Sequence, residues 1–171
     1  TVLIALIATA LIAPSMGPAV ANQSTSVLPS WAVKSTIYEV NVRQYSTAGD
    51  FKSVTNSLPR LKRLGVGILW LMPIQPISKV KRKGTLGSPY SVADYKGINP
   101  EFGTAEDFQA LIDEAHKLGL KVIIDWVANH SGWDNPWIAN ESWYHRDLNG
   151  KVISPNNDWT DVAWLDYENP N

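Results

Sequence analysis

The order of apolar segments between residues 35 and 127 constrains the fold more than any other feature of this sequence. Strand-like and helix-like segments alternate there, at 35–45, 51–64, 67–71, 104–118 and 120–127. The second and third strand-like segments, GILWL and LKVIIDWV, are apolar on both faces. Parallel strands that are covered by helices have this composition, whereas antiparallel strands usually alternate apolar and polar residues. The sequence therefore predicts an α/β fold with a parallel sheet.

The ends of the two helix-like segments support this prediction. Apolar residues recur at helical spacing in 51–64, and Pro59 predicts a kink or a restarted turn inside that segment. Thr104 is the expected N-cap of the second helix, and Asp107 completes the pattern of a capping box. Gly119 supplies the expected C-terminal stop. Both segments are therefore predicted to be amphipathic helices.

The composition excludes several classes of protein. The 171 residues include no cysteine, which excludes disulfide scaffolds, thiolate metal sites and cysteine nucleophiles. The 15 Lys and Arg against 16 Asp and Glu give a net charge of −1, so no binding of nucleic acid is predicted. The basic run at 79–83 is expected to be a solvated loop. No Gly-x-Gly-x-x-Gly motif follows the first strand, so dinucleotide binding has no support.

Residues 1–21 carry no charge and are expected to form a signal peptide. Their apolar run, 2–13, is shorter than the roughly 20 residues that span a bilayer as a helix. The Ala-Val-Ala that ends this region suits cleavage after residue 21, which predicts a secreted or periplasmic protein without a membrane segment. The alternative is a buried apolar helix. Residues 22–34 are predicted to be a leader, and we expect the sequence to be incomplete before Thr1, because the usual basic start is missing.

Polar residues gather at the end of the third predicted strand, at Asp125, Asn129 and His130. Barrels of parallel strands and helices place their active sites at the carboxyl ends of the strands. A carboxylate there would point into the mouth of the barrel, and an amide or imidazole at the rim can bind a polar ligand or, for the amide oxygen, a hard cation. The alternative is structural, with Asp125 paired to an arginine, Asn129 in a turn and His130 as a loop cap. The residues alone leave both interpretations open.

A long loop, 84–103, precedes the second helix, and a loop of this length is more often functional than idle. Its candidates for a polyhydroxylated ligand are Tyr90, Asp94 and Tyr95, which offer ring faces and an acceptor. The alternative is that one tyrosine packs on the rim and that Asp94 caps a turn. Both interpretations stay open on the residues alone.

Six of the eight tryptophans fall between residues 126 and 164. Their ring faces suit stacking on sugars, but we favour a small core for an irregular segment. Large aromatic side chains supply most of the buried area where regular elements are few.

Three stretches carry a resemblance to a known family: IYEVNVRQYS at 37–46, PYSVADYKGINPEFGT at 89–104 and DWVANH at 125–130. Together they resemble the N-terminal part of the catalytic domain of the alpha-amylase family, glycoside hydrolase family 13. The closing DWTDVAWLDYENPN resembles the segment before the family's fourth strand. The resemblance implies a TIM (β/α)8 barrel, of which residues 35–130 supply the first three strands and two helices. Residues 131–171 would be a short irregular insertion after the third strand.

The resemblance also implies roles for single residues. Tyr90 corresponds to an aromatic that stacks on the sugar next to the bond being cut, and His130 to a histidine that hydrogen-bonds a hydroxyl of that sugar. Asp125 corresponds to a buried aspartate that orients the site without attacking. Asn129 corresponds to a ligand of structural calcium in many members. However, Trp164 stands where calcium-binding members often carry an aspartate, and calcium takes six to eight oxygen ligands.

No catalytic residue is assigned in this sequence. Retaining glycosidases use two carboxylates about 5 Å apart. The resemblance implies that these lie at the ends of the fourth and fifth strands, with a third carboxylate after the seventh. We therefore expect Asn171 to mark a truncation. Pro89 replaces a glycine that is frequent in the family, so the backbone before Tyr90 is expected to differ.

The function implied is that of a secreted retaining glycoside hydrolase acting on α-glucosidic bonds of starch-like glucans. This chain would supply part of the substrate cleft. The expected partner is an α-glucan oligosaccharide or polysaccharide, and calcium is the one candidate cofactor. Two alternatives remain, a transglycosylating or isomerising enzyme of the same family and a non-catalytic glucan-binding relative.

Overall fold

The computed structural model describes residues 28–169. The predicted signal peptide, residues 1–21, lies outside the described residues. The chain divides into two units, residues 1–33 and residues 34–171. The elements below belong to the second unit.

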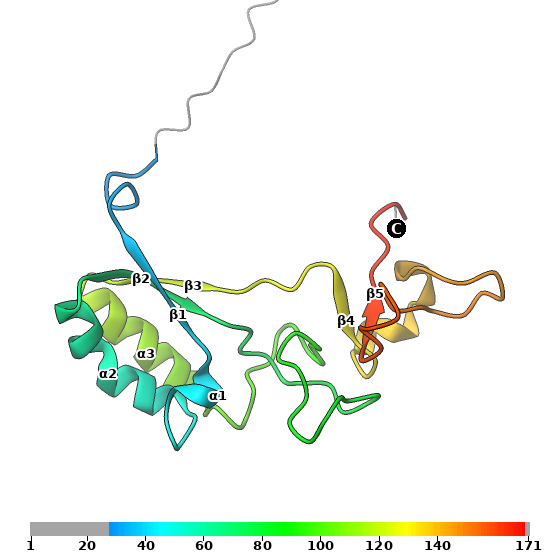
Figure 1. Cartoon of the computed structure of the whole chain (residues 1–171), viewed down its shortest axis with the longest axis horizontal. Helices are drawn as coiled ribbons and strands as arrows, with labels where there is room; N and C mark the ends of the chain where they lie inside the picture. Colours follow the sequence, from blue (N-terminus) through cyan, green and yellow to red (C-terminus); the bar gives the residue numbers. More distant parts are fainter. Residues whose placement is uncertain (1–27, 170–171) are drawn as a thin grey trace, which may run out of the picture. The chain divides into compact units, whose positions relative to one another are not determined.

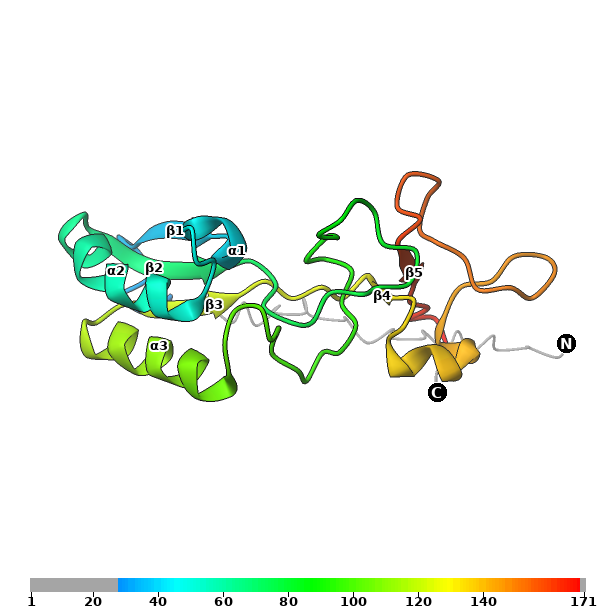
Figure 2. The same cartoon turned by 90° about the horizontal axis from the view of Figure 1, so that it is seen from below.

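A parallel sheet of three strands carries the first part of this unit. Its order is β1 (Thr36–Val40), β2 (Val66–Leu71) and β3 (Lys121–Ile124), with β2 in the centre (Figure 1). Two helices, α2 (Phe51–Arg63) and α3 (Ala105–Lys117), connect the strands and lie together on one face of the sheet, as Figure 2 shows from below. This arrangement confirms the predicted α/β fold with a parallel sheet.

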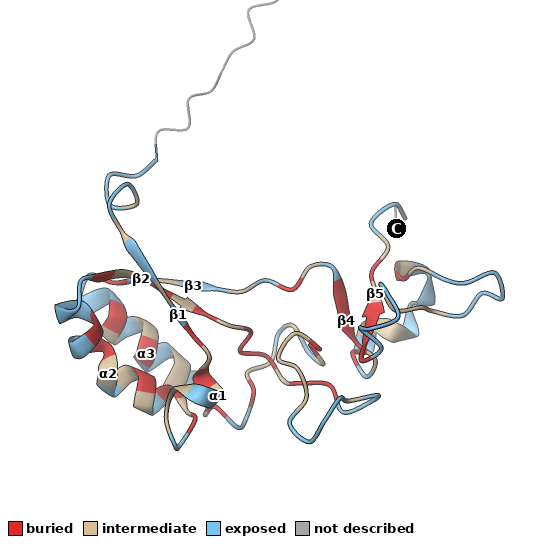
Figure 3. Ribbon diagram, viewed as in Figure 1, coloured by how far each residue is buried: buried red, intermediate tan, exposed pale blue. Residues whose placement is uncertain are grey.

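The main core lies between the sheet and the two helices. Phe51, Leu58, Leu69 and Leu111 are fully buried in it, and buried residues line the inner sides of both helices in Figure 3. Each such side chain contributes about 1.5–3 kcal/mol when it leaves water. Ile123 of β3, by contrast, is exposed. Strands of a closed barrel are covered on both faces, so this exposure is what a three-strand portion of a barrel leaves.

The helix boundaries follow the sequence signals. In α3 the Thr104 side chain accepts from the Asp107 backbone and the Asp107 side chain accepts from the Thr104 backbone, so the predicted capping box is confirmed. Of the predicted kink or restarted turn at Pro59, the restart does not occur, because Pro59 lies inside one continuous helix. Burial of Phe51, Leu58 and the other core residues of α2 holds this helix together, and tertiary packing outweighs the loss of one backbone bond.

Two predicted strands are longer than the observed ones. The segment 35–45 ends as a strand at Val40, and α1 (Val42–Tyr45) follows as a short helix. The segment 120–127 ends as a strand at Ile124. The ladder stops there because Pro73, just past the end of the neighbouring β2, has no N–H to donate. Asp125 is still anchored at this end, since its N–H donates to the Leu71 carbonyl at 2.8 Å.

An irregular segment follows the sheet. It contains an antiparallel pair, β4 (His130–Gly132) and β5 (Val162–Trp164), and two 3-10 helices, η1 (Pro136–Ala139) and η2 (Glu141–Trp143). Tyr144, Ala163 and Leu165 form its small core, against which three tryptophans pack, Trp133, Trp137 and Trp143. The interpretation of the tryptophans as core residues is therefore correct for these three.

Within residues 28–169, no helix combines the length and the apolar character that a bilayer crossing requires.

Candidate functional site

Tyr90 and Asp125 meet at the carboxyl end of the parallel sheet. Tyr90 lies in the long loop between β2 and α3, and Asp125 directly follows β3. The Tyr90 hydroxyl donates to Oδ2 of Asp125 at 2.7 Å. Burial, followed by the hydrogen bond and the charge of Asp125, raises the pKa of Tyr90 to about 12. The phenol therefore stays a neutral donor at physiological pH, with its ring held in one orientation.

His130 begins β4 and is 9% exposed. Its Nδ1 lies 3.0 Å from Nδ2 of Asn129. When the Asn129 amide donates this bond, the neutral imidazole carries its proton on Nε2. Burial lowers the pKa of His130, while a bond to the Tyr90 backbone and the charge of Asp161 act in the opposite direction. His130 is therefore a neutral ring at physiological pH, able to donate one hydrogen bond.

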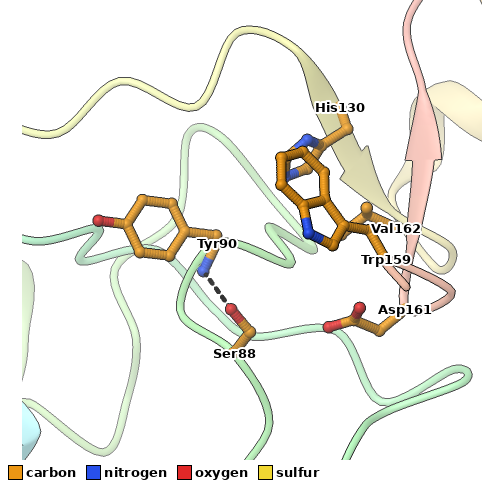
Figure 4. A pocket seen from close by; sticks show the side chains of 6 residues that line it. All are labelled: Ser88, Tyr90, His130, Trp159, Asp161 and Val162. Carbon is orange, nitrogen blue, oxygen red and sulfur yellow. Dashed lines mark hydrogen bonds between the residues drawn. The ribbon is translucent and has the colours of Figure 1, made fainter. Parts of the chain in front are cut away.

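A pocket of about 330 Å³ lies at these residues and is lined by Ser88, Tyr90, His130, Trp159, Asp161 and Val162. Figure 4 shows Tyr90 on one side of the pocket and His130 with Trp159 on the other. Ligand sites of small molecules begin at about this size. Aromatic faces beside a carboxylate, a hydroxyl and an imidazole form the kind of lining that suits a polyhydroxylated ligand.

The other two candidates of the loop 84–103, Tyr95 and Asp94, make structural contacts and do not line the pocket. The Tyr95 hydroxyl contacts the carbonyls of Val127 at 2.9 Å and His130 at 2.5 Å, and its ring stacks on Trp137 at 4.7 Å between centroids. Asp94 accepts from the backbone N–H of Lys96 at 2.9 Å, so it caps a turn. The structural alternative is therefore correct for Tyr95 and Asp94, whereas Tyr90 lines the pocket.

Arg43 anchors the loop that carries Tyr90, and sequence patterns did not single it out. Its Nη1 donates to the Leu86 carbonyl at 3.1 Å, and its Nη2 donates to the Gly87 carbonyl at 3.2 Å. Arg43 lies in α1, and the β-rich composition around it led to the prediction of a strand there. The available signal was that Arg43 is the only cation of residues 35–45.

Asp161 was not singled out by the sequence, and Trp159, for which a place in a small core was favoured, lines the pocket instead. Both precede β5 in the closing segment of the chain. The Asp161 carboxylate lies 3.7 Å from Nζ of Lys83, and its side chain is 9% exposed. The Ser91 hydroxyl donates to the Asp161 carbonyl at 2.7 Å, which ties this segment to the loop of Tyr90. Trp159 and Asp161 reach the pocket because β4 pairs with β5, and this pairing has no periodic pattern in the sequence.

Asn129 is the residue predicted to ligate calcium. Its side-chain amide contacts His130, its carbonyl accepts from the Leu165 N–H at 3.1 Å, and Trp164 lies opposite His130 in the β4–β5 ladder. Residues 28–169 contain no group of three or more His, Cys, Asp or Glu side chains placed to hold a metal ion. Calcium needs six to eight oxygens. Calcium at Asn129 therefore stays a prediction.

The parallel strands and their covering helices have the arrangement of a portion of a (β/α)8 barrel, and the pocket lies at the carboxyl ends of these strands. The profile of the family described as alpha amylase, catalytic domain, matches residues 26–168. The chain therefore belongs to the alpha-amylase family, and the predicted family and barrel fold are confirmed.

Individual relatives agree with this assignment. The crystal structure of an alpha-amylase from Lactobacillus plantarum is 52% identical with a TM-score of 0.77, over 78% of this chain and 32% of that one. A trehalose synthase of Pimelobacter sp. (strain R48) is 43% identical over 114 residues, which are 64% of this chain and 19% of the relative. Alpha-amylase SusG of Bacteroides thetaiotaomicron is 42% identical over 94 residues, 55% of this chain and 13% of the relative. The chain thus spans about a fifth or less of these two curated relatives.

Proposed function

We propose that this chain is the N-terminal part of a retaining glycoside hydrolase that acts on α-glucosidic bonds of starch-like glucans. The hydrogen bond between Tyr90 and Asp125 beside the buried His130, in a chain of the alpha-amylase family, is the observation that supports this function best.

In this proposal the three residues hold the glucosyl unit next to the bond that is cut. The ring of Tyr90 stacks on the apolar face of the sugar, and Asp125 fixes that ring through the 2.7 Å hydrogen bond. His130 donates from Nε2 to a sugar hydroxyl. Asp125 is then a positioning residue, because its Oδ2 is occupied by Tyr90.

Retention requires a nucleophile and an acid/base about 5 Å apart. Neither carboxylate of the described site suits these roles, since Asp125 accepts from Tyr90 and Asp161 pairs with Lys83. We therefore place both catalytic carboxylates on later strands of the full-length protein, as the family resemblance implies.

An isomerising or transglycosylating enzyme is the second candidate function. The relative that supports it is the Pimelobacter protein named trehalose synthase, at 43% identity. The two candidates differ in where water or a sugar hydroxyl attacks, so the products separate them. Maltose converted to glucose favours hydrolysis, and maltose converted to another disaccharide favours isomerisation.

We also propose export to the periplasm or the medium, supported by the uncharged apolar residues 1–21. N-terminal sequencing of the mature protein, made in its native host, tests this. A mature start at Asn22 supports export, and retention of residues 1–21 contradicts it.

The site assignment is tested with the full-length protein acting on maltotriose. We expect His130→Ala to lower kcat/KM by roughly 100-fold, since it removes a hydrogen bond to the sugar in a buried site. His116→Ala, at an exposed position of α3, is the matched control and should stay within about 2-fold of the wild type. Equal effects of the two substitutions would contradict the proposed role of His130.

A further inference from the structure

Trp159 occupies the outer edge of the pocket. It is 49% exposed, whereas His130 beneath it is 9% exposed. The two rings lie 5.7 Å apart between centroids at an interplanar angle of 63°. Figure 4 shows them on the side of the pocket that faces Tyr90. The pocket therefore has an inner part at His130 and an outer part at Trp159.

Trp159 is not part of the small core of the irregular segment. Three other tryptophans, Trp133, Trp137 and Trp143, pack against that core. Trp159 instead leaves half of a large apolar surface in solvent at the mouth of a pocket. Exposed aromatic surface that borders a cleft is a common mark of a ligand-binding position.

The backbone around Trp159 is held from several sides. Oδ1 of Asn156 accepts from the N–H groups of Asp158 and Trp159, both at 2.9 Å. Nε1 of Trp133 donates to the Thr160 carbonyl at 3.0 Å. The Lys83 ammonium donates to the Asp158 carbonyl and pairs with the Asp161 carboxylate. A fixed backbone lets an exposed indole bind without first being ordered, which reduces the entropy cost of binding.

We propose that Trp159 is a specificity-determining residue that stacks on a second glucosyl unit, adjacent to the one held by Tyr90 and His130. This inference rests on the proposed function of the pocket. A glucan whose inner unit lies at His130 leaves the pocket across the outer edge, where the indole face meets the apolar face of the next pyranose ring. Trp159 thereby favours chains of two or more units over a single glucosyl unit.

The experiment compares two substrates on the full-length protein. Maltotriose occupies both positions, whereas α-glucosyl fluoride carries one glucosyl unit and a small leaving group. We expect Trp159→Ala to lower kcat/KM for maltotriose roughly 10-fold more than for α-glucosyl fluoride, as the loss of one stacking contact predicts. Trp159→Phe, which keeps an aromatic face, should recover most of this difference. Trp31→Ala is the matched control, because Trp31 is 48% exposed and is not among the residues that line the pocket.

The outcomes are distinct. A changed substrate ratio in Trp159→Ala, recovered in Trp159→Phe and absent in Trp31→Ala, supports the inference. Equal losses on both substrates, or no loss on either, overturn it while the proposed function stands. A wild-type protein that turns over neither substrate overturns the proposed function and this inference together.

Discussion

The hydroxyl of Tyr90 donates a 2.7 Å hydrogen bond to the Asp125 carboxylate, across 35 positions of sequence. One partner comes from a long loop and the other from the end of a buried strand. The bond ties the loop to the end of strand β3, so the loop presents the Tyr90 ring at the carboxyl end of the sheet. In the proposed enzyme this is how a sugar-stacking face is fixed before the substrate arrives.

A double-mutant cycle on this pair measures the link. Tyr90→Phe removes the donor, and Asp125→Asn removes the charge of the acceptor. We expect each single variant of the full-length protein to lower kcat/KM for maltotriose, and the pair to show a coupling of about 1 kcal/mol, since hydrogen bonds to charged groups exceed neutral ones by about that amount. Strictly additive losses would show that the bond does not contribute to the site.

The pH response of His130 follows from its burial, which lowers its pKa below the ordinary value of 6.5. A histidine with a lowered pKa in the folded protein stabilises the fold above its unfolded pKa, and this contribution is lost as the pH falls through the folded pKa. We expect an NMR titration to show a histidine midpoint below 6.5 that disappears in His130→Gln. A midpoint above 6.5 for that resonance would contradict the assignment.

Arg43 should act on the substrate through the loop it holds. Arg43→Ala removes the donors to the carbonyls of Leu86 and Gly87, so the segment before Tyr90 loses its anchor. We expect kcat/KM for maltotriose to fall roughly 10-fold, together with faster proteolysis within residues 84–88. Arg63→Ala, at an exposed position of α2, is the control and should change neither readout. Unchanged proteolysis in Arg43→Ala would contradict the anchoring role.

Gly132 is required for close packing between β4 and Ser78, which lies in the connection from β2 to α3. A Cβ at this position would lie 2.5 Å from Cβ of Ser78. We expect Gly132→Ala to lower the free energy of unfolding by about 1–3 kcal/mol, as overpacking does. The second variant, Gly132→Ala with Ser78→Gly, removes the contact with the Ser78 side chain and should recover part of the loss in thermal unfolding. If the double variant recovered none of the lost stability, the contact with Ser78 would not be the cause of the loss.

Local patterns were sufficient for the regular half of the chain. Apolar periodicity located α2, β2 and α3, and the Thr104–Asp107 capping box marked the start of α3 correctly. Strand ends were less predictable, because they depend on the neighbouring strand. β3 stops at Ile124 where β2 stops beside it, and Val42–Tyr45 form a helix despite a β-rich composition.

The site was predictable where its residues lie at strand ends. Asp125 and His130 follow β3, and the structure brings Tyr90 to Asp125, a contact that the sequence analysis did not predict. Trp159, Asp161 and Arg43 were not predictable in the same way. Their positions depend on contacts between irregular segments, which have no repeating pattern in the sequence.

We propose above that this chain supplies the side chains that hold a glucosyl unit in a retaining enzyme for α-glucosidic bonds. The most direct measurement is ¹H NMR of the new reducing end formed when the full-length protein hydrolyses maltotriose, recorded before mutarotation. We expect the α-anomer. Initial release of the β-anomer, or no cleavage of maltotriose at all, would contradict it.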